Sequence, residues 1–347
     1  MITAVIGGQY GSEGKGKVVQ YLSPDYDIFV RVGGPNAGHV VYYNPLEKTG
    51  KSSENGCVKF TMRSVPCGWI NFNATLIIGA GAVLNIELLE EELTELSKYD
   101  PLIRKRLYID NNAMIINDIH IKEESKIMDT IGSTGQGVGN ARIERIKRTA
   151  RLAKDYPELE PYLADTVQML YYNRGKNILL EGTQGSGLSM IHGEYPYTTS
   201  HDTNVSQLLA DVGLPPSAID NIIMVIRTYP IRVGGNSGPL HKEVSFDTLK
   251  SRIGPVTEYT SVTKKMRRIG MFDMNQIEKT ARLNNPTHFA LMFADYLDKD
   301  NYGVTEFENL SQDVLRLTKS IITATDAIPM FISTGPHTMV DLRDIYE

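Results

Sequence analysis

Short apolar runs recur along the chain, and each gives way to glycine or polar residues. The first run, at residues 3–6, leads directly into a glycine-rich stretch. A strand that is covered on both faces reads as a continuous apolar run, so this segment predicts a buried parallel strand. Seven further runs predict strands of the same kind, at residues 28–32, 75–78, 107–109, 178–180, 222–226, 289–293 and 330–332.

Helical spacing separates several of these runs. Ile86, Leu89, Leu93 and Leu96 recur at intervals of three and four residues, and Asn85 is a suitable N-cap immediately before them. Strands that alternate with helices predict an α/β fold, with a large, mainly parallel central sheet flanked by helices. In such sheets, ligands bind at the carboxyl ends of the strands.

Glycines cluster where predicted strands end. One such cluster is ordinary turn chemistry, but a repeated pattern indicates that the backbone approaches a large ligand at several points. The five clusters lie at residues 7–16, 33–38, 132–139, 182–187 and 234–238.

The overall composition limits the class of protein. The chain has 347 residues, 41% hydrophobic and 22% charged, with a formal net charge of -5, which argues against a general affinity for nucleic acid. Cys57 and Cys67 fit no metal-binding spacing, and we expect inert thiols in a reducing compartment. No signal-peptide pattern or membrane-spanning stretch is visible, so we expect a cytoplasmic protein with no membrane partner.

No repeat or linker divides the chain. We therefore expect a single domain over residues 1–347, with helical and loop subdomains at approximately residues 85–175 and 240–285.

The first glycine cluster has the chemistry of a phosphate site. Backbone N–H groups of a glycine loop that opens a helix form an anion cradle, and Lys15 and Lys17 add positive charge. The loop is not a Walker A motif, because Gln9 replaces a glycine and Gly16 replaces the Ser or Thr after the lysine. The simpler alternative is a glycine turn with solvated lysines.

The second cluster ends in Gly38 and His39. A backbone carbonyl such as that of Gly38 is a good hard ligand for Mg²⁺. His39 is a candidate donor to a phosphoryl oxygen or a general acid, although a lone histidine is more often structural.

Two further clusters carry polar side chains. Ser133 and Thr134 suit a phosphate monoester, whereas the basic residues at 142–151 are equally explained as a solvated helix face. Gln184 offers a donor and an acceptor, which suits the edge of a base. The hydroxyls and cations at residues 260–268 suit a dicarboxylate, because arginine binds carboxylates bidentately; a basic surface loop is the alternative.

Taken together, these segments resemble the adenylosuccinate synthetase family. The resemblance covers nearly the whole chain and includes the N-A-G-H loop at residues 36–39 and the terminal S-T-G-P at residues 333–336. It also includes the G-x-T-G-x-G, E-G-x-Q-G and H-G-x-Y-P-Y motifs in the same order. The chain is shorter than typical bacterial members, mainly between residues 295 and 333. The resemblance implies a P-loop-like fold and a ligase that phosphorylates a purine 6-oxo group and displaces the phosphate with L-aspartate.

The resemblance also implies roles for individual residues. The chemistry would involve Ser12, Lys15, His39 and Gln184. The triphosphate donor would be held by Gly11, Ser12, Glu13, Gly14, Lys15, Gly16, Lys17, Gly38, His39, Asp295, Ser333, Gly335 and Pro336. The monophosphate substrate would be held by Ser12, Asn36, Ser133, Thr134, Arg148, Gln184, Thr199, Val233 and Lys265, with Arg148 reaching across a homodimer. Aspartate would be bound by Val262, Thr263, Lys264, Lys265 and Arg267, and Mg²⁺ by Gly38 and Ser12.

Three departures from the family pattern concern the substrates. The family carries an aspartate, the base for the purine N1 proton, where Ser12 stands, and serine cannot serve as a base unaided. A serine leaves room for the 2-amino group of guanine, as in the phage branch of the family that acts on dGMP. Lys265 replaces an arginine near the ribose 2′-hydroxyl, which is compatible with deoxyribose. Phe293 replaces the lysine of a guanine-reading pair with Asp295, and an aromatic ring can stack on adenine.

The leading hypothesis is therefore a phage-type enzyme that uses dGMP, L-aspartate and ATP, with GTP or dATP as alternative donors, in the host cytoplasm. An ordinary adenylosuccinate synthetase acting on IMP with GTP is the close alternative. A nucleotide-binding switch protein is a remote one, because the glycine-lysine loop alone would also serve a switch.

Overall fold

The structure is a computed structural model that describes residues 1–46, 56–254, 256–260 and 265–346. Its centre is a ten-stranded sheet in the order β17-β16-β15-β11-β1-β10-β2-β5-β7-β9. Neighbouring strands are parallel throughout, except that β17 runs antiparallel to β16. The strands are β1 (Ile2–Gly7), β2 (Ile28–Arg31), β5 (Thr75–Ile78), β7 (Leu107–Asp110), β9 (Leu163–Ala164), β10 (Ile178–Glu181), β11 (Asn221–Arg227), β15 (His288–Met292), β16 (Ile328–Ser333) and β17 (Met339–Asp341).

All eight apolar runs form strands of this sheet, so the predicted α/β fold with a large, mainly parallel sheet is confirmed. The edge strands β9 and β17 were not predicted. They have only two and three residues, which is too short for a hydrophobic period to show.

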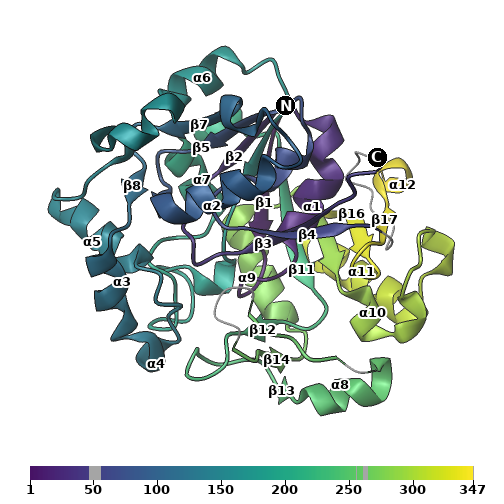
Figure 1. Cartoon of the computed structure of the whole chain (residues 1–347). Coiled ribbons are helices and arrows are strands. Elements are labelled where there is room, and N and C mark those ends of the chain that lie inside the picture. Colours follow the sequence, from purple (N-terminus) through teal and green to yellow (C-terminus); the bar gives the residue numbers. More distant parts are fainter. Residues whose placement is uncertain (47–55, 255, 261–264, 347) are drawn as a thin grey trace.

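Helices cover both faces of the sheet (Figure 1). The predicted helix is α2 (Ile86–Leu96), and the Asn85 side chain caps it by accepting from the Leu88 N–H. The others are α1 (Lys15–Leu22), α3 (Asp118–Ser125), α4 (Met128–Ile131), α5 (Val138–Lys147), α6 (Thr166–Tyr172), α7 (Val205–Val212), α8 (Phe246–Ile253), α9 (Met274–Asn284), α10 (Ala294–Leu297), α11 (Gln312–Thr325) and α12 (Arg343–Tyr346). Short 3₁₀ helices are η1 (Ser23–Asp25), η2 (Cys67–Ile70), η3 (Ile103–Lys105), η4 (Ala153–Asp155), η5 (Pro157–Tyr162), η6 (Ser186–Leu188), η7 (Pro216–Ala218), η8 (Lys299–Asn301) and η9 (Phe307–Asn309).

Three small sheets accompany the central one. One has three strands in the order β12 (Ile231–Arg232), β14 (Arg268–Gly270) and β13 (Glu243–Val244). The other two are strand pairs: β3 (His39–Tyr43) with β4 (Val58–Met62), and β6 (Val83–Leu84) with β8 (Met114–Ile115). The predicted subdomain at residues 85–175 supplies β7 and β9 to the central sheet as well as α2 to α6, so it is interwoven with that sheet. The segment at residues 240–285 contains β13, α8, β14 and α9.

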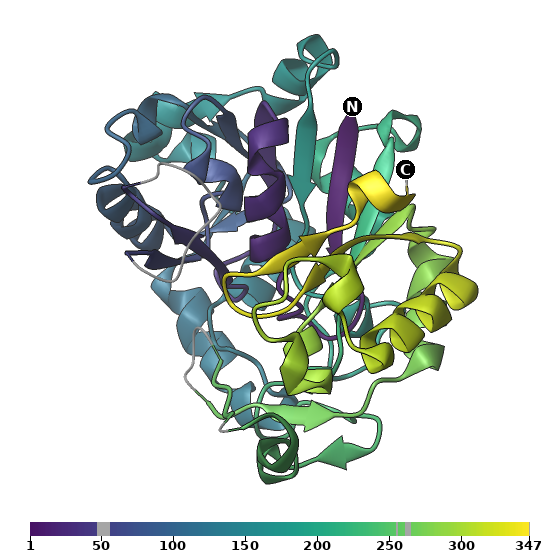
Figure 2. The same ribbon diagram turned by 90° about the vertical axis from the view of Figure 1, so that its right-hand side faces the viewer.

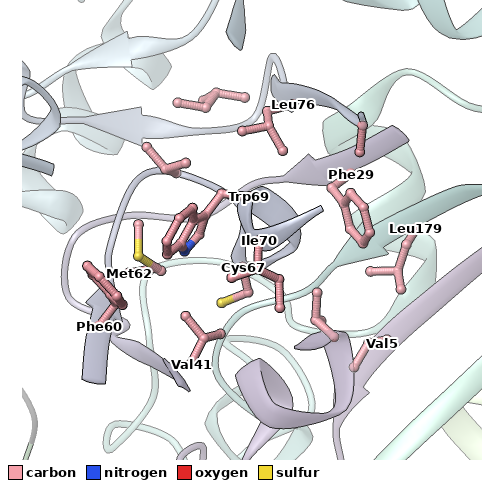
Figure 3. Close-up of a cluster of buried hydrophobic side chains, with 14 of the residues drawn as sticks. Val5, Phe29, Val41, Phe60, Met62, Cys67, Trp69, Ile70, Leu76 and Leu179 are labelled. Atoms are coloured by element: carbon pink, nitrogen blue, oxygen red, sulfur yellow. The ribbon is translucent and has the colours of Figure 1, made fainter. Parts of the chain in front are cut away.

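The core lies on both faces of the sheet because side chains alternate along each strand. In β1, Val5 belongs to one buried cluster while Ala4 and Ile6 belong to the other. Figure 3 shows part of the first cluster, in which Trp69 is fully buried and its ring centroid lies 5.0 Å from that of Phe60. Within the part of the chain that is described, no helix is long and apolar enough to cross a bilayer.

The strand directions determine where a ligand can bind. Strand β1 runs from the N terminus toward the end of the molecule where α8 and the β12-β14-β13 sheet lie (Figures 1 and 2). The carboxyl ends of the other parallel strands point the same way, so the loops that follow them meet at this end.

Candidate active site

A cavity of about 480 Å³ opens at the carboxyl ends of the central strands. That volume is in the range of small-molecule sites. All five glycine clusters contribute to its wall, through residues such as Gly11, Gly38, Gly132, Gln184 and Ser237. The convergence predicted from the repeated glycines is therefore present in the fold.

The first glycine loop joins β1 to α1 and owes its shape to close backbone contacts. A Cβ on Gly7 would lie 2.3 Å from the Gln184 carbonyl oxygen, and Gly14 has a φ of 103°, so both positions require glycine. Gly14 caps α1 without a side-chain hydrogen bond, which leaves N–H groups at the helix terminus available to an anion.

Glu13, which we expected to contact the triphosphate, has a different place. Its side chain is fully buried and does not line the cavity. One carboxylate oxygen accepts from the N–H groups of Gln9 at 3.1 Å and Gly11 at 2.7 Å, and the other from Lys15 Nζ at 2.7 Å. Glu13 thus fixes the conformation of the loop from within.

The two lysines of α1 point to different sites. Lys15 lines the cavity, and its ammonium group donates to Glu13 and to the Gln184 carbonyl, so one of its three donors is left for a ligand. Lys17 lies outside the cavity wall, and its Nζ donates to Ser333 Oγ at 2.8 Å and to the carbonyls of Gly335 and Thr338 at 2.6 Å. These three acceptors occupy the three donors of Lys17, so a direct hydrogen bond from Lys17 to a phosphate would have to replace one of them, and its role in phosphate binding stays a prediction.

His39 lines the cavity and is held from behind by buried charges. Its Nδ1 lies 2.5 Å from Glu181 Oε1, and Arg31 Nη1 donates to the same oxygen at 2.5 Å. Burial lowers the pKa of His39 to about 4, an effect that Arg31 reinforces and Glu181 opposes. The contact at Nδ1 requires a proton there, so Nε2 is the ring nitrogen that remains for a ligand.

Ser12 is exposed on the cavity wall with a φ of 57°. Its hydroxyl accepts from Arg267 Nη2 at 3.1 Å, and its carbonyl accepts from Arg227 Nη1 at 3.3 Å. Arg267, expected in the aspartate site, also lines the cavity. Ser12, the departure that the family resemblance implies, is thus in direct contact with that arginine.

Most residues expected around the monophosphate substrate share this one cavity. They are Ser12, Asn36, Ser133, Thr134, Gln184, Thr199 and Val233. Glu124 also lines it and was not predicted; it accepts from the Ser133 hydroxyl at 2.8 Å and the Gly139 N–H at 3.2 Å. A phosphate bound there would compete with this carboxylate for the same donors.

Other expected residues lie elsewhere. Arg148, at the exposed end of α5, donates to the Ile146 carbonyl, and neither it nor Lys265 lines the cavity. Gly14, Gly16, Asp295, Ser333, Gly335 and Pro336 are also absent from the wall, and the terminal turn at 333–338 is bonded to Lys17. Val262, Thr263 and Lys264 lie outside the described residues.

The thiol prediction agrees with the structure for one cysteine. Burial raises the pKa of Cys67 well above its ordinary value, which suits an inert thiol. Cys57 is partly exposed.

Sequence reasoning missed the buried ionic groups that support the wall. Glu181 was read only as part of a motif, and Arg31, Arg227 and Glu258 were not considered. Three of their contacts, Arg227 with Glu258, Arg31 with Glu181 and Arg227 with Ser12, join residues 31, 150 and 215 positions apart, separations for which the sequence carries no local signal.

A glycine loop at a strand-to-helix junction, a buried lysine and an amide around one cavity define a nucleotide-binding enzyme with a P-loop-like site. The adenylosuccinate synthetase family model matches residues 4–156 and 149–304 of the chain. Relatives with this name include those of Methanococcus aeolicus, 38% identical over 98% of this chain and 99% of theirs, and Methanocaldococcus jannaschii, 39% identical over 99% and 97%. The chain therefore belongs to the adenylosuccinate synthetase family and is a carbon–nitrogen ligase that uses a triphosphate donor.

Two solved structures share the fold over 98% of this chain. The adenylosuccinate synthetase of Plasmodium falciparum, 22% identical, superposes with a TM-score of 0.82 over 99% of its length. The succinoaminodeoxyadenylate synthetase of cyanophage S-2L, bound to dGMP and dATP, is 28% identical and superposes with a TM-score of 0.81 over 95% of its length.

Proposed function

We propose that this enzyme joins L-aspartate to C6 of dGMP, with ATP as phosphoryl donor, and forms the succino-derivative of 2-amino-2′-deoxyadenylate. The observation that carries the proposal is Ser12 on the cavity wall, where the family has an aspartate. A short neutral side chain leaves space for the 2-amino group of guanine. The cyanophage relative, which binds dGMP and dATP, supports the same substrate class.

The residues of the cavity suit a two-step reaction. The amides of the first loop and Lys15 would hold the γ-phosphoryl group, and the Gln184 amide would hold the 6-oxo group. The purine O6 attacks the γ-phosphorus and the bond to the diphosphate breaks. The aspartate amine then attacks C6 and expels inorganic phosphate, a far better leaving group than the original oxygen.

The predicted magnesium site has suitable donors. Gly38 and Ser12 line the same cavity, and a backbone carbonyl and a hydroxyl are both hard oxygen ligands that Mg²⁺ accepts beside phosphates and water. When bound, Mg²⁺ would neutralise charge on the migrating phosphoryl group.

The choice of ATP rests on the loss of a lysine at position 293 and on the aromatic ring that stands in its place. The Phe293 ring lies 4.0 Å from the Arg227 guanidinium carbon, so one face is already covered. Stacking on adenine would use the other face of the ring and stays part of the proposal. The dATP of the cyanophage relative supports an adenine donor.

A homodimer remains part of the proposal. Arg148 is exposed and lies outside the cavity of its own chain. Such a residue is available to a neighbouring subunit, as the family resemblance implies.

The competing function is an ordinary adenylosuccinate synthetase that acts on IMP. The archaeal relatives favour it, because their identity of 37 to 40% exceeds the 28% of the cyanophage enzyme. Its weakness is the missing base at Ser12. Membership of the family leaves the nucleotide-switch alternative without support.

One substrate comparison tests the proposal. The protein is incubated with Mg²⁺, ATP and aspartate plus either dGMP or IMP, and the products are identified by mass spectrometry. We expect the succino-product from dGMP. Product from IMP alone would overturn the dGMP assignment and leave the ordinary reaction in its place.

A further inference from the structure

A buried cluster of three charged side chains lies behind the cavity wall at Ser12. Glu258 accepts from Arg227 Nη2 at 2.5 Å through one carboxylate oxygen and from Arg267 Nη1 at 2.7 Å through the other. The side chains of Arg227, Arg267 and Glu258 are 0%, 11% and 13% exposed. One carboxylate thus joins two guanidinium groups that would otherwise repel each other.

The cluster fastens one loop to the central sheet. Segments 256–260 and 265–267 pair as antiparallel chains, with the Arg267 N–H bonded to the Glu258 carbonyl and the Thr260 N–H to the Lys265 carbonyl, both at 2.9 Å. Arg227 is the last residue of β11 and is itself held by the Phe293 ring. The Glu258 carboxylate therefore connects this paired segment to the carboxyl end of a central strand.

Only one member of the cluster reaches the cavity. Arg267 lines the wall and contacts the Ser12 hydroxyl, whereas Glu258 and Arg227 do not line it. Two positive charges share one negative charge, so the cluster retains about one unit of positive charge, presented at Arg267. This is the complement that a carboxylate substrate requires.

The two arginines favour the ionised form of the Glu258 carboxylate at neutral pH. Burial would raise its pKa, but Arg227 and then Arg267 lower it to about 2. Its orienting effect on the two arginines is therefore constant across neutral pH.

We propose that Glu258 is a positioning residue that holds Arg267 in the orientation needed to bind a carboxylate of the amino-acid substrate. The inference rests on the proposed function, together with the aspartate-binding role that the family resemblance implies for Arg267. Glu258 does not touch the substrate. It acts by holding Arg267 Nη1, while Arg267 Nη2 bonds the Ser12 hydroxyl and the side chain lines the cavity.

The test uses the Glu258→Gln variant, which keeps the size of the side chain but removes its charge. We expect the KM for aspartate to rise roughly tenfold or more, because a mispositioned bidentate arginine loses its charge-assisted bonds. The kcat at saturating aspartate and the KM for the purine monophosphate should stay within about threefold. The matched control is Glu243→Gln, since Glu243 also pairs with an arginine, Arg268, but on the exposed β13. This control should leave the aspartate KM unchanged.

A double-mutant cycle separates positioning from general support. In an Arg267→Ala background, Glu258→Gln should change the aspartate KM little further, because Glu258 acts through Arg267. A full additional rise there, or a parallel rise in the KM of every substrate, would overturn the proposal. So would an unchanged aspartate KM in Glu258→Gln alone.

Two further measurements keep the test decisive. If Glu258→Gln does not fold, Glu258→Asp keeps the charge on a shorter arm, and an unchanged aspartate KM in that variant overturns the proposal. The wild-type assay tests the proposed function separately. If the wild type forms a succino-product from IMP but not from dGMP, the assignment of dGMP as substrate is wrong. The role of Glu258 can then still be measured with IMP. If the wild type forms no succino-product from either, the proposed function and the inference fail together.

Discussion

Removal of the Glu181 carboxylate should destabilise the protein strongly. It is fully buried and accepts from Arg31, from His39 and, at 2.7 Å, from the Cys67 N–H. The Glu181→Gln substitution keeps the shape but removes the charge. Breaking a buried pair from one side leaves the other charge uncompensated, which costs about 3 to 5 kcal/mol.

The pKa of Glu181 provides a second route to this magnitude. Burial would raise it, but Arg31 and then His39 lower it to about 2. Against an unfolded value of about 4.3, at about 1.4 kcal/mol per pKa unit, the ionised folded form gains about 3 kcal/mol. Because the folded pKa is depressed, this stabilisation is present above about pH 4.3 and is lost as the pH falls through about 2.

His39 adds a separate dependence on pH. Its folded pKa of about 4 lies below the unfolded value of about 6.5, so the unfolded chain takes up this proton first as the pH falls. The stability of the wild type should therefore begin to decline below about pH 6.5, before Glu181 titrates.

Urea unfolding at about pH 7 measures the effect. Glu181→Gln should lower the free energy of unfolding by about 3 to 5 kcal/mol. The control Glu278→Gln removes a solvent-exposed partner 3.6 Å from Arg282 and should cost less than about 1 kcal/mol. If Glu181→Gln unfolds within about 1 kcal/mol of the wild type, the buried cluster does not stabilise the fold as argued.

Three other predictions address the site directly. Ser12→Asp should shift the ratio of kcat/KM for IMP over dGMP upward by roughly tenfold, by crowding the 2-amino group; an unaltered ratio counts against steric room as the purpose of the serine. Lys17→Met should raise the KM for the triphosphate roughly tenfold with little change for dGMP, because the terminal turn loses three hydrogen bonds; equal effects on both nucleotides would refute a donor-specific role. Arg148→Ala and His39→Ala should each be nearly inactive, yet regain up to about a quarter of the activity when mixed and allowed to exchange subunits; no recovery would argue against a site shared across a dimer.

The main sheet was predictable because its strands are buried on both faces. A run such as residues 222–226 needs no period to be recognised, since every side chain in β11 from Ile222 to Arg227 is buried. The strands β12 and β13 were not predicted, because a strand of two residues is too short to show a hydrophobic pattern. The single-domain boundary and the dimer stay predictions.

The parts of the site that are formed by backbone loops were predictable from the sequence. The parts that depend on ion pairs between residues far apart in the sequence were not. Glycine loops after parallel strands must converge at one edge, so Ser12, Gly38 and Gln184 were placed together correctly by topology. The opposite directions of Lys15 and Lys17 follow from helix geometry, because side chains two residues apart point about 200° apart. That signal was present in the sequence. No comparable rule pairs Arg227 with Glu258.

The charges around Ser12 explain why a neutral residue is workable there. Lys15 is offset by Glu13, and Arg267 shares Glu258 with Arg227, so these groups beside Ser12 keep a modest positive excess that no carboxylate at position 12 cancels. The substrates of the proposed reaction are all anions, and they supply the missing negative charge on binding. A serine therefore removes a base from the chemistry but strengthens the attraction between the wall and its anionic ligands. Arg267 donates a hydrogen bond to a neutral hydroxyl at position 12, and its positive charge is not neutralised there as it would be by a carboxylate.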